Sequence, residues 1–396
     1  MFKEILIVSL LIMGASPSEA ATPPDCQKPT AETGKNICSS LVASEPSDAA
    51  GFLDRGINAF SAGASDRAMA DFNRAIALDP NFAAAYSARG VAYRAKGDLD
   101  SALADFNRAI ALDPKRAIPY KNRGSVLLRK GAWDLAMVDL NKAIDLDPSS
   151  AAAYDNRGLV YKHQGKIDLA IADFTKAIEL DPNGANKYAN RGLAFSRKGD
   201  LDQALTDFTR AIELDPNNAG AYSGRGYTYH SKGDADRALT DFSKAIELDP
   251  KDAVRWRMRG IAWFDDGDFK GAAPDLLHSL DIEADAYTML FRYLAKARGG
   301  EAAGDELAAN AARLNAKDWP YVVIDLYLGK STPAATLAAA AKPDDRCEAL
   351  FYIGEWYLLN SDRKNAEASL QKAVNTCRKD YFEYTSAGAE LKRLKP

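Results

Sequence analysis

Three asparagines that share one spacing offer the first chemistry in this sequence. Asn122, Asn156 and Asn190 follow one another at intervals of 34 residues. A side-chain amide carries both an acceptor oxygen and N–H donors, so it can pair with the backbone of an extended peptide. We therefore predict a short peptide-binding ladder, with a solvated helix face as the alternative. The same position in the neighbouring repeats carries Asp54, Ala88, Gly224 and Met258.

Basic side chains form a second candidate. Arg94, Arg129, Lys162 and Arg197 each fall near the end of the same predicted helix in their own repeats. Together they predict a cationic rim suited to acidic peptides. The alternative is that they complement the negative C-terminal end of a helix dipole without any ligand.

Residues suited to catalysis or metal binding are few. The chain has three histidines and four cysteines, and neither type shows zinc-ligand spacing. It has no H-E-x-x-H, no G-x-S-x-G and no phosphate-binding glycine loop. A net charge of −4 gives no overall attraction to phosphates. We therefore expect no catalytic residue, no metal, no cofactor and no nucleic-acid partner.

A period of 34 residues divides the chain between 49 and 286 into seven blocks. In the block 83–116, apolar residues at helical spacings predict two helices. Gly97 between them can adopt the left-handed conformation that ends a helix, and Pro114 stops the second. Gly90, at position 8, is predicted to face the small Ala102 at position 20. Each block is therefore predicted to be an antiparallel helix hairpin, and the stacked hairpins an all-α solenoid.

Every block also carries an arginine at position 7 and an aspartate at position 23. In a hairpin that turns near position 15 these positions lie level, so we expect partly buried, charge-assisted pairs. We assign the pairs to architecture, and expect the loss of one partner to cost about 3–5 kcal/mol. They are Arg55 with Asp71, Arg89 with Asp105, Arg123 with Asp139, Arg157 with Asp173, Arg191 with Asp207, Arg225 with Asp241, and Arg259 with Asp275.

The pattern of apolar and small residues resembles the tetratricopeptide repeat (TPR) family. In one block it consists of Tyr86, Gly90, Tyr93, Ala102, Phe106, Ala109 and Pro114. The resemblance implies a right-handed superhelix whose first helices line a concave groove that binds proteins or extended peptides. The asparagine series is similar to the ladder in the TPR superhelix of O-GlcNAc transferase, which implies sequence-tolerant gripping of a peptide backbone.

The N-terminus predicts export. Lys3 precedes an apolar run from Ile5 to Met13, and small residues flank a cleavage point after Ala20. The apolar run is shorter than the roughly 20 residues that span a bilayer. We expect a signal peptide at 1–20, a flexible leader at 21–48 and a periplasmic or secreted product without a transmembrane segment.

The pattern changes after residue 286. We expect seven regular units at 49–286, a degenerate helical region at 287–346, a further TPR-like unit at 347–380 and a polar capping helix at 381–396. Cys347 and Cys377 fall where two antiparallel helices begin and end, which favours a disulfide. Four cysteines allow three connectivities, and the simplest also pairs Cys26 with Cys38.

Two C-terminal segments, Asp318–Lys330 and Phe351–Leu359, resemble the NlpI family of bacterial TPR lipoproteins. This resemblance implies a periplasmic adaptor that docks cell-envelope hydrolases or proteases and can form a homodimer. The chain departs from that family because it lacks a cysteine in position to be lipidated. We therefore expect a non-enzymatic adaptor or scaffold. The alternatives are a self-associating structural envelope protein and an enzyme built from residues 287–346.

Overall fold

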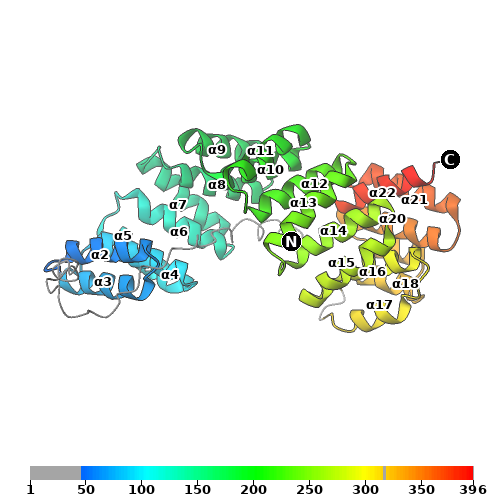
Figure 1. Cartoon of the computed structure of the whole chain (residues 1–396), viewed down its shortest axis with the longest axis horizontal. Coiled ribbons are helices and arrows are strands. Elements are labelled where there is room, and N and C mark those ends of the chain that lie inside the picture. The colour runs from blue at the N-terminus through cyan, green and yellow to red at the C-terminus, as the bar shows by residue number, and fades with distance from the viewer. Residues whose placement is uncertain (1–45, 315–317, 396) are drawn as a thin grey trace, which may run out of the picture. The chain divides into compact units, whose positions relative to one another are not determined.

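The computed structural model describes residues 46–314 and 318–395. Within these ranges the chain forms 21 α-helices and no strand (Figure 1). The predicted signal peptide, most of the leader, and Cys26 and Cys38 lie outside the described residues. The chain divides into two compact units after Pro182. We call their described parts the N-terminal unit (46–182) and the C-terminal unit (183–395), and each is described by itself.

The hairpin of residues 83–116 shows how the sequence builds one helix pair. Helix α4 (Ala83–Ala95) ends before Gly97, whose φ of 83° lies in the left-handed region that favours glycine. Helix α5 (Leu99–Leu112) begins after Asp98, whose carboxylate accepts a hydrogen bond from the Ser101 N–H at 3.0 Å. Pro114 lies beyond the end of α5, where it prevents continuation of the helix.

The N-terminal unit contains four such pairs, and its first helices form an inner row. Each first helix packs on its own second helix, and consecutive first helices of this unit also contact one another. Comparable contacts between consecutive second helices are lacking within this unit. The pairs are α2 (Ala49–Ser61) with α3 (Ser65–Leu78), α4 with α5, α6 (Ala117–Arg129) with α7 (Trp133–Leu146), and α8 (Ala151–His163) with α9 (Ile167–Leu180).

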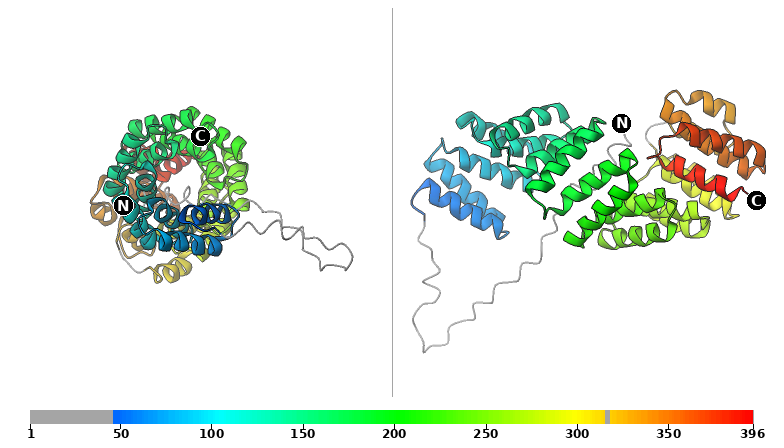
Figure 2. Two further views of the ribbon diagram at one scale, coloured as in Figure 1. Left: turned by 90° about the vertical axis from the view of Figure 1, so that its left-hand side faces the viewer. Right: turned by 90° about the horizontal axis from the view of Figure 1, so that it is seen from above.

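The C-terminal unit begins with three regular pairs, and its first helices also contact one another (Figure 2). They are α10 (Ala185–Lys198) with α11 (Leu201–Leu214), α12 (Ala219–Ser231) with α13 (Ala235–Leu248), and α14 (Ala253–Asp266) with α15 (Phe269–Ile282). Pro274 lies inside α15 without ending it. As in the other unit, the first helices are the inner row.

The rest of the C-terminal unit is less regular. It comprises α16 (Ala286–Arg298), α17 (Gly304–Ala311), α18 (Tyr321–Tyr327), α19 (Pro333–Ala339), the pair α20 (Pro343–Leu359) and α21 (Arg363–Thr376), and α22 (Phe382–Arg393). The last helix is not simply a polar cap, because it packs against α14 as well as α20 and α21 and buries Glu383, Ser386, Ala387 and Glu390. None of the helices in the described ranges has the length and apolar character needed to cross a membrane.

The glycine at position 8 makes room for the large side chain at position 24. A Cβ on Gly158 would lie 2.6 Å from Cε1 of Phe174, a distance that Cβ atoms do not tolerate. Gly90 has the same relation to Phe106, at 2.7 Å. The alanine at position 20 lies nearby as well, because a Cβ on Gly226 would be 3.2 Å from the Ala238 carbonyl oxygen. The close approach seats the side chain of position 24 in the core of the hairpin.

The arginine at position 7 contacts the aspartate at position 23 in all seven blocks. Its Nε and Nη2 atoms each donate to one carboxylate oxygen, over 2.6–2.9 Å. The aspartates are buried and the arginines half-buried. The hydrogen bond to Asp139 raises the pKa of Arg123, although burial opposes the shift. Such bidentate pairs fix the position of one helix along the other.

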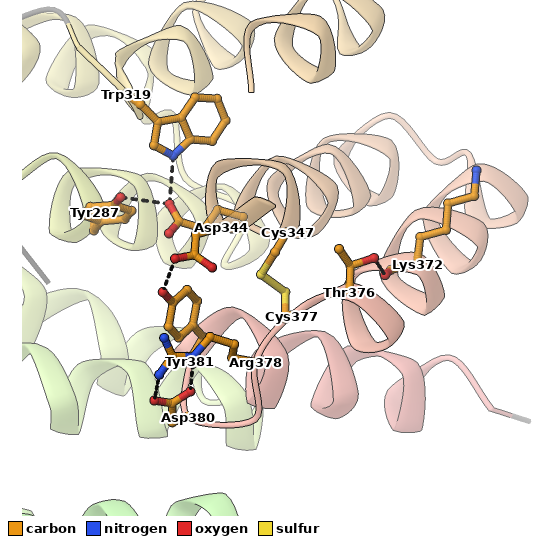
Figure 3. The surroundings of a disulfide bond; sticks show 11 residues. Tyr287, Trp319, Asp344, Cys347, Lys372, Thr376, Cys377, Arg378, Asp380 and Tyr381 are labelled. Atoms are coloured by element: carbon orange, nitrogen blue, oxygen red, sulfur yellow. Dashed lines mark hydrogen bonds and ion pairs between the residues drawn. A yellow bond between two sulfur atoms is a disulfide. The ribbon is translucent and has the colours of Figure 1, made fainter. Parts of the chain in front are cut away.

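A disulfide joins the two ends of the α20–α21 pair. The sulfur atoms of Cys347 and Cys377 are 2.07 Å apart and their Cα atoms 4.9 Å apart (Figure 3). Beside Cys347, the Glu348 carboxylate accepts hydrogen bonds from the Tyr287 hydroxyl at 2.8 Å and the Trp319 indole at 2.9 Å. This part of the unit is therefore held by a covalent bond and by buried polar contacts.

Candidate peptide-binding surface

The inner row of the N-terminal unit carries two of the three predicted asparagines. Asn122 lies on α6 and is 6% exposed, and Asn156 lies on α8 and is half-buried. The third, Asn190, lies on α10 of the C-terminal unit and is buried. Within the N-terminal unit the ladder therefore consists of two amides, on helices that contact each other.

Two of the predicted basic residues meet at the ends of α4 and α6. Arg94 is half-buried, and its Nη1 donates to the Ser125 hydroxyl of α6 at 3.1 Å. Arg129 is exposed, and its Nη1 donates to the backbone carbonyl of Arg94 at 3.5 Å. The second contact is the helix-terminus interaction considered as the alternative to ligand binding. The two guanidinium groups therefore belong to one site, although neighbouring repeats supply them.

Lys121 is a third cation of this site that sequence reasoning missed. It lies one turn before Ser125 on α6, and burial together with the charge of Arg94 lowers its pKa. Burial and the charge of Arg129 likewise lower the pKa of Arg94. Lys121 occupies position 5 of its block, whereas the rim was sought only at helix ends. The sequence could have indicated Lys121 through the stacking of the repeats, because position 5 of one first helix adjoins position 12 of the preceding first helix.

These three cations form a subsite suited to an anion. Asp147 weakly favours the charged form of Lys121, yet none of the three side chains forms an ion pair within the described residues. A bound carboxylate would favour the charged forms of these side chains and offset the repulsion between them. We call Arg94, Lys121 and Arg129, with Ser125 between them, the cationic subsite.

The remaining rim candidates lie elsewhere. Lys162, on α8, is 1% exposed. Arg197, on α10 of the C-terminal unit, is half-buried. Neither is part of the cationic subsite.

The histidines are engaged with aromatic rings or an acid. The His163 ring stacks on Trp133 with centroids 3.8 Å apart, and His278 lies 4.1 Å from the ring of Trp256. His230 Nε2 is 2.8 Å from Asp265 Oδ2. In the part of the chain that the structure describes, no three His, Cys, Asp or Glu side chains gather as a metal site.

Family comparison confirms the repeats. The profile described as TPR repeat matches residues 59–94, 90–131, 124–165 and 196–233, and the one described as tetratricopeptide repeat matches 151–183 and 219–252. These regions of the chain therefore carry tetratricopeptide repeats. No curated protein matches the chain.

A solved structure shares the fold over part of this chain. A chain of the APC/C hetero-tetramer Cut9–Hcn1 aligns with a TM-score of 0.54 at 21% identity, covering 57% of this chain. This chain spans only 44% of that one, so the similarity concerns the fold. A tetratricopeptide repeat protein from Parabacteroides merdae aligns with a TM-score of 0.49 at 21% identity, covering 62% of this chain and 98% of its own.

Proposed function

Because the chain carries tetratricopeptide repeats, we propose that it is a non-enzymatic adaptor that binds an acidic peptide segment along the inner row of its N-terminal unit. The cationic subsite is the single observation that carries this proposal. Arg94, Lys121 and Arg129 are brought together from α4 and α6, and their charges form no ion pair with any acid in the described ranges.

The neighbouring amides complement the charges. Asn122 follows Lys121 directly, and Asn156 lies on the next inner helix. Each offers a donor and an acceptor to a peptide backbone, whereas the cationic subsite takes a carboxylate. The bound segment would thus be selected by its charge and held by its backbone.

We also propose that the protein is exported to the periplasm or to the outside of the cell. This proposal of export rests on the apolar run and cleavage pattern of residues 1–20. The Cys347–Cys377 disulfide is of the kind that persists in oxidising compartments. By resemblance to the NlpI family, the partners would be cell-envelope hydrolases or proteases that the adaptor docks.

A direct binding experiment tests the peptide site. The probe is a fluorescein-labelled octapeptide of alternating alanine and glutamate, measured by fluorescence anisotropy at low salt. We expect Lys121→Gln to weaken binding about tenfold, which corresponds to about 1.4 kcal/mol, and added salt to weaken it further. Arg67→Gln, an exposed change on α3, is the control and should leave the affinity unchanged. Equal affinities of the Lys121 and Arg67 variants would rule the site out.

Crosslinking in the native periplasm followed by mass spectrometry identifies the partners. The same experiment is repeated with Asn122, Asn156 and Asn190 all changed to alanine. We expect the set of crosslinked proteins to shrink. An unchanged set would show that the asparagines do not hold the partner. It would not affect the octapeptide test of the cationic subsite.

Self-association is a second candidate, favoured by an apolar surface on the outer helices of the N-terminal unit. Leu135 and Val138 on α7 are 62% and 65% exposed, and Leu169 on α9 is 49% exposed. Sedimentation of the purified protein separates the two functions, because large assemblies that Leu135→Lys dissolves would indicate a structural role. Monomers or dimers would favour the adaptor. Turnover of envelope substrates by the purified chain would instead support the enzymatic alternative at 287–346.

A further inference from the structure

The last helix, α22, contacts the inner row of the C-terminal unit at three levels. At its start, the Tyr227 hydroxyl of α12 donates to the Asp380 carbonyl at 2.8 Å. The Tyr227 ring meets Phe382 edge-on, with centroids 5.5 Å apart. Tyr227 occupies position 9 of its block. The start of α22 therefore rests on the inner surface.

The middle of α22 contacts a buried aspartate. The Ser386 hydroxyl donates to Asp265 Oδ2 at 2.9 Å, and the same oxygen is 2.8 Å from His230 Nε2. His230 lies at position 12 on α12 and Asp265 at position 13 on α14. Two inner helices and α22 thus share one polar contact.

The end of α22 brings cations to the ends of the inner helices. Arg393 Nη1 donates to the carbonyls of Asp265 at 2.7 Å and Phe264 at 3.3 Å, in the last turn of α14. Lys392 lies near the end of α12. Its Nζ is 3.5 Å from the point that a Cβ on Gly233 would occupy. Carbonyls at a helix C-terminus carry partial negative charge, so both placements are electrostatically favourable.

In one repeat of the N-terminal unit, a basic residue of the neighbouring repeat contacts the helix end. There Arg129, at position 13, donates to the Arg94 carbonyl at the end of α4. In the sixth and seventh blocks position 13 is Ser231 and Asp265, neither of which is a cation. At the ends of α12 and α14 the nearby cations come from α22 instead.

Part of this surface is closed to solvent beneath α22. His230, which shares Asp265 Oδ2 with Ser386 of α22, is 5% exposed. On the facing side of the contact, Ser386 and Ala387 of α22 are fully buried. Helix α22 thus covers part of the inner row of the C-terminal unit.

We infer that the inner face of α12 and α14 is a docking site for an α-helix with a basic C-terminal end, and that α22 occupies it as the chain's own ligand. This site prefers a basic segment, whereas the cationic subsite prefers an acidic one. The inference does not depend on the acidic-peptide proposal. Partner segments would enter the C-terminal unit only where α22 has withdrawn.

The disulfide keeps the ligand close to its site. Cys377, bonded to Cys347 on α20, precedes the start of α22 at Phe382 by only five residues. A short flexible tether gives a local concentration in the millimolar range, so a partner helix must compete against it. On its other side α22 is held by Arg298 of α16, which donates to Glu390 at 3.2 Å.

Cutting the tether in the full chain tests whether α22 behaves as a ligand. A protease recognition sequence is inserted between Arg378 and Lys379, which are both exposed. After cleavage, exchange of the C-terminal fragment is followed by adding a fluorescein-labelled peptide of residues 379–395 and separating the bound label by gel filtration. We expect the labelled peptide to replace the fragment while circular dichroism shows the helices intact. The uncleaved chain should bind none.

Matched variants tie the exchange to the inner face. Arg393→Gln in the cleaved chain should release the fragment about tenfold faster, whereas Lys379→Gln, outside α22, should not change the rate. Exchange that occurs only in urea concentrations that unfold the whole unit would show that α22 is a core element and overturn the inference. A cleaved chain that loses its helices outright would overturn it as well. Neither result bears on the octapeptide test of the N-terminal unit.

Discussion

Arg123 binds Asn107 of the preceding block with the same guanidinium that holds Asp139 of its own. Its Nη1 donates to Asn107 Oδ1 at 2.6 Å, while Nε and Nη2 bind the Asp139 carboxylate. Arg89 and Arg157 make the same contact with Asn73 and Asn141. Each arginine therefore fixes the register within a hairpin and joins it to its neighbour, which is the interaction that stabilises repeat arrays.

Changing Arg123 to leucine should destabilise the protein strongly. Asp139 would keep its charge in a buried position without its two hydrogen bonds, and the link to Asn107 would be lost. We expect the free energy of unfolding to fall by about 3–5 kcal/mol, measured by urea unfolding with circular dichroism.

Two companions make the arginine result specific. Leucine at both Arg123 and Asp139 should recover part of the loss, because no charge is then stranded. Arg67→Leu, exposed on α3, should change stability by about 0.5 kcal/mol or less. An Arg123 variant as stable as the Arg67 variant would show that the ladder is not needed for folding.

A pair of glycine substitutions tests the packing at position 8. Gly158→Ala would place a Cβ 2.6 Å from the Phe174 ring, so we expect a loss of about 1–3 kcal/mol from overpacking. Gly388→Ala, within α22, meets no atom within 4 Å and should stabilise the helix by about 0.5–1 kcal/mol. Thermal unfolding of both variants provides the measurement, and the same sign of change in the two would contradict the packing described.

Removing the Cys347–Cys377 disulfide should cost about 3–4 kcal/mol, because it closes a loop of 30 residues in the unfolded chain. The test is the double variant Cys347→Ala and Cys377→Ala, compared with the parent by urea unfolding without reductant. The same comparison with reductant is the control, since the difference should then become small. A parent and variant of equal stability without reductant would refute the stabilising role.

Glu355 should make the protein less stable as the pH rises from about 4.5 to about 8. Its burial, together with the nearby Glu390 carboxylate, raises the pKa of Glu355 to about 8, although Arg298 opposes the shift. The folded chain therefore retains a proton that the unfolded chain releases near the ordinary value of 4.5. Because the folded state binds more protons between these values, the free energy of unfolding falls as the pH rises toward 8.

A glutamine at Glu355 removes this titration while keeping an acceptor for Arg298. We expect Glu355→Gln to lose less stability than the parent between pH 6 and pH 8.5, measured from urea midpoints. Glu367→Gln, at a surface pair with Arg363, is the control and should decline like the parent. Parallel declines in all three proteins would refute the assignment.

Regularity made the helix pairs and their ion pairs predictable. Arg89 and Asp105 are 16 residues apart in one hairpin, so the turn position alone sets them level with each other. The contact of the Phe106 ring with Gly90 was not predicted, because sequence spacing does not say how far a side chain reaches across the hairpin. Lys121 was missed because its neighbour Arg94 belongs to another repeat.

The sequence by itself determined the hairpins, their boundaries and the arginine–aspartate register, since these depend on short separations repeated with one period. Only the tertiary structure decided where α22 lies, because Ser386 and Asp265 are 121 residues apart and the irregular helices between them set the path of the chain. Contacts within a hairpin follow from local geometry, whereas contacts across the unit depend on the direction in which every intervening helix leaves its turn.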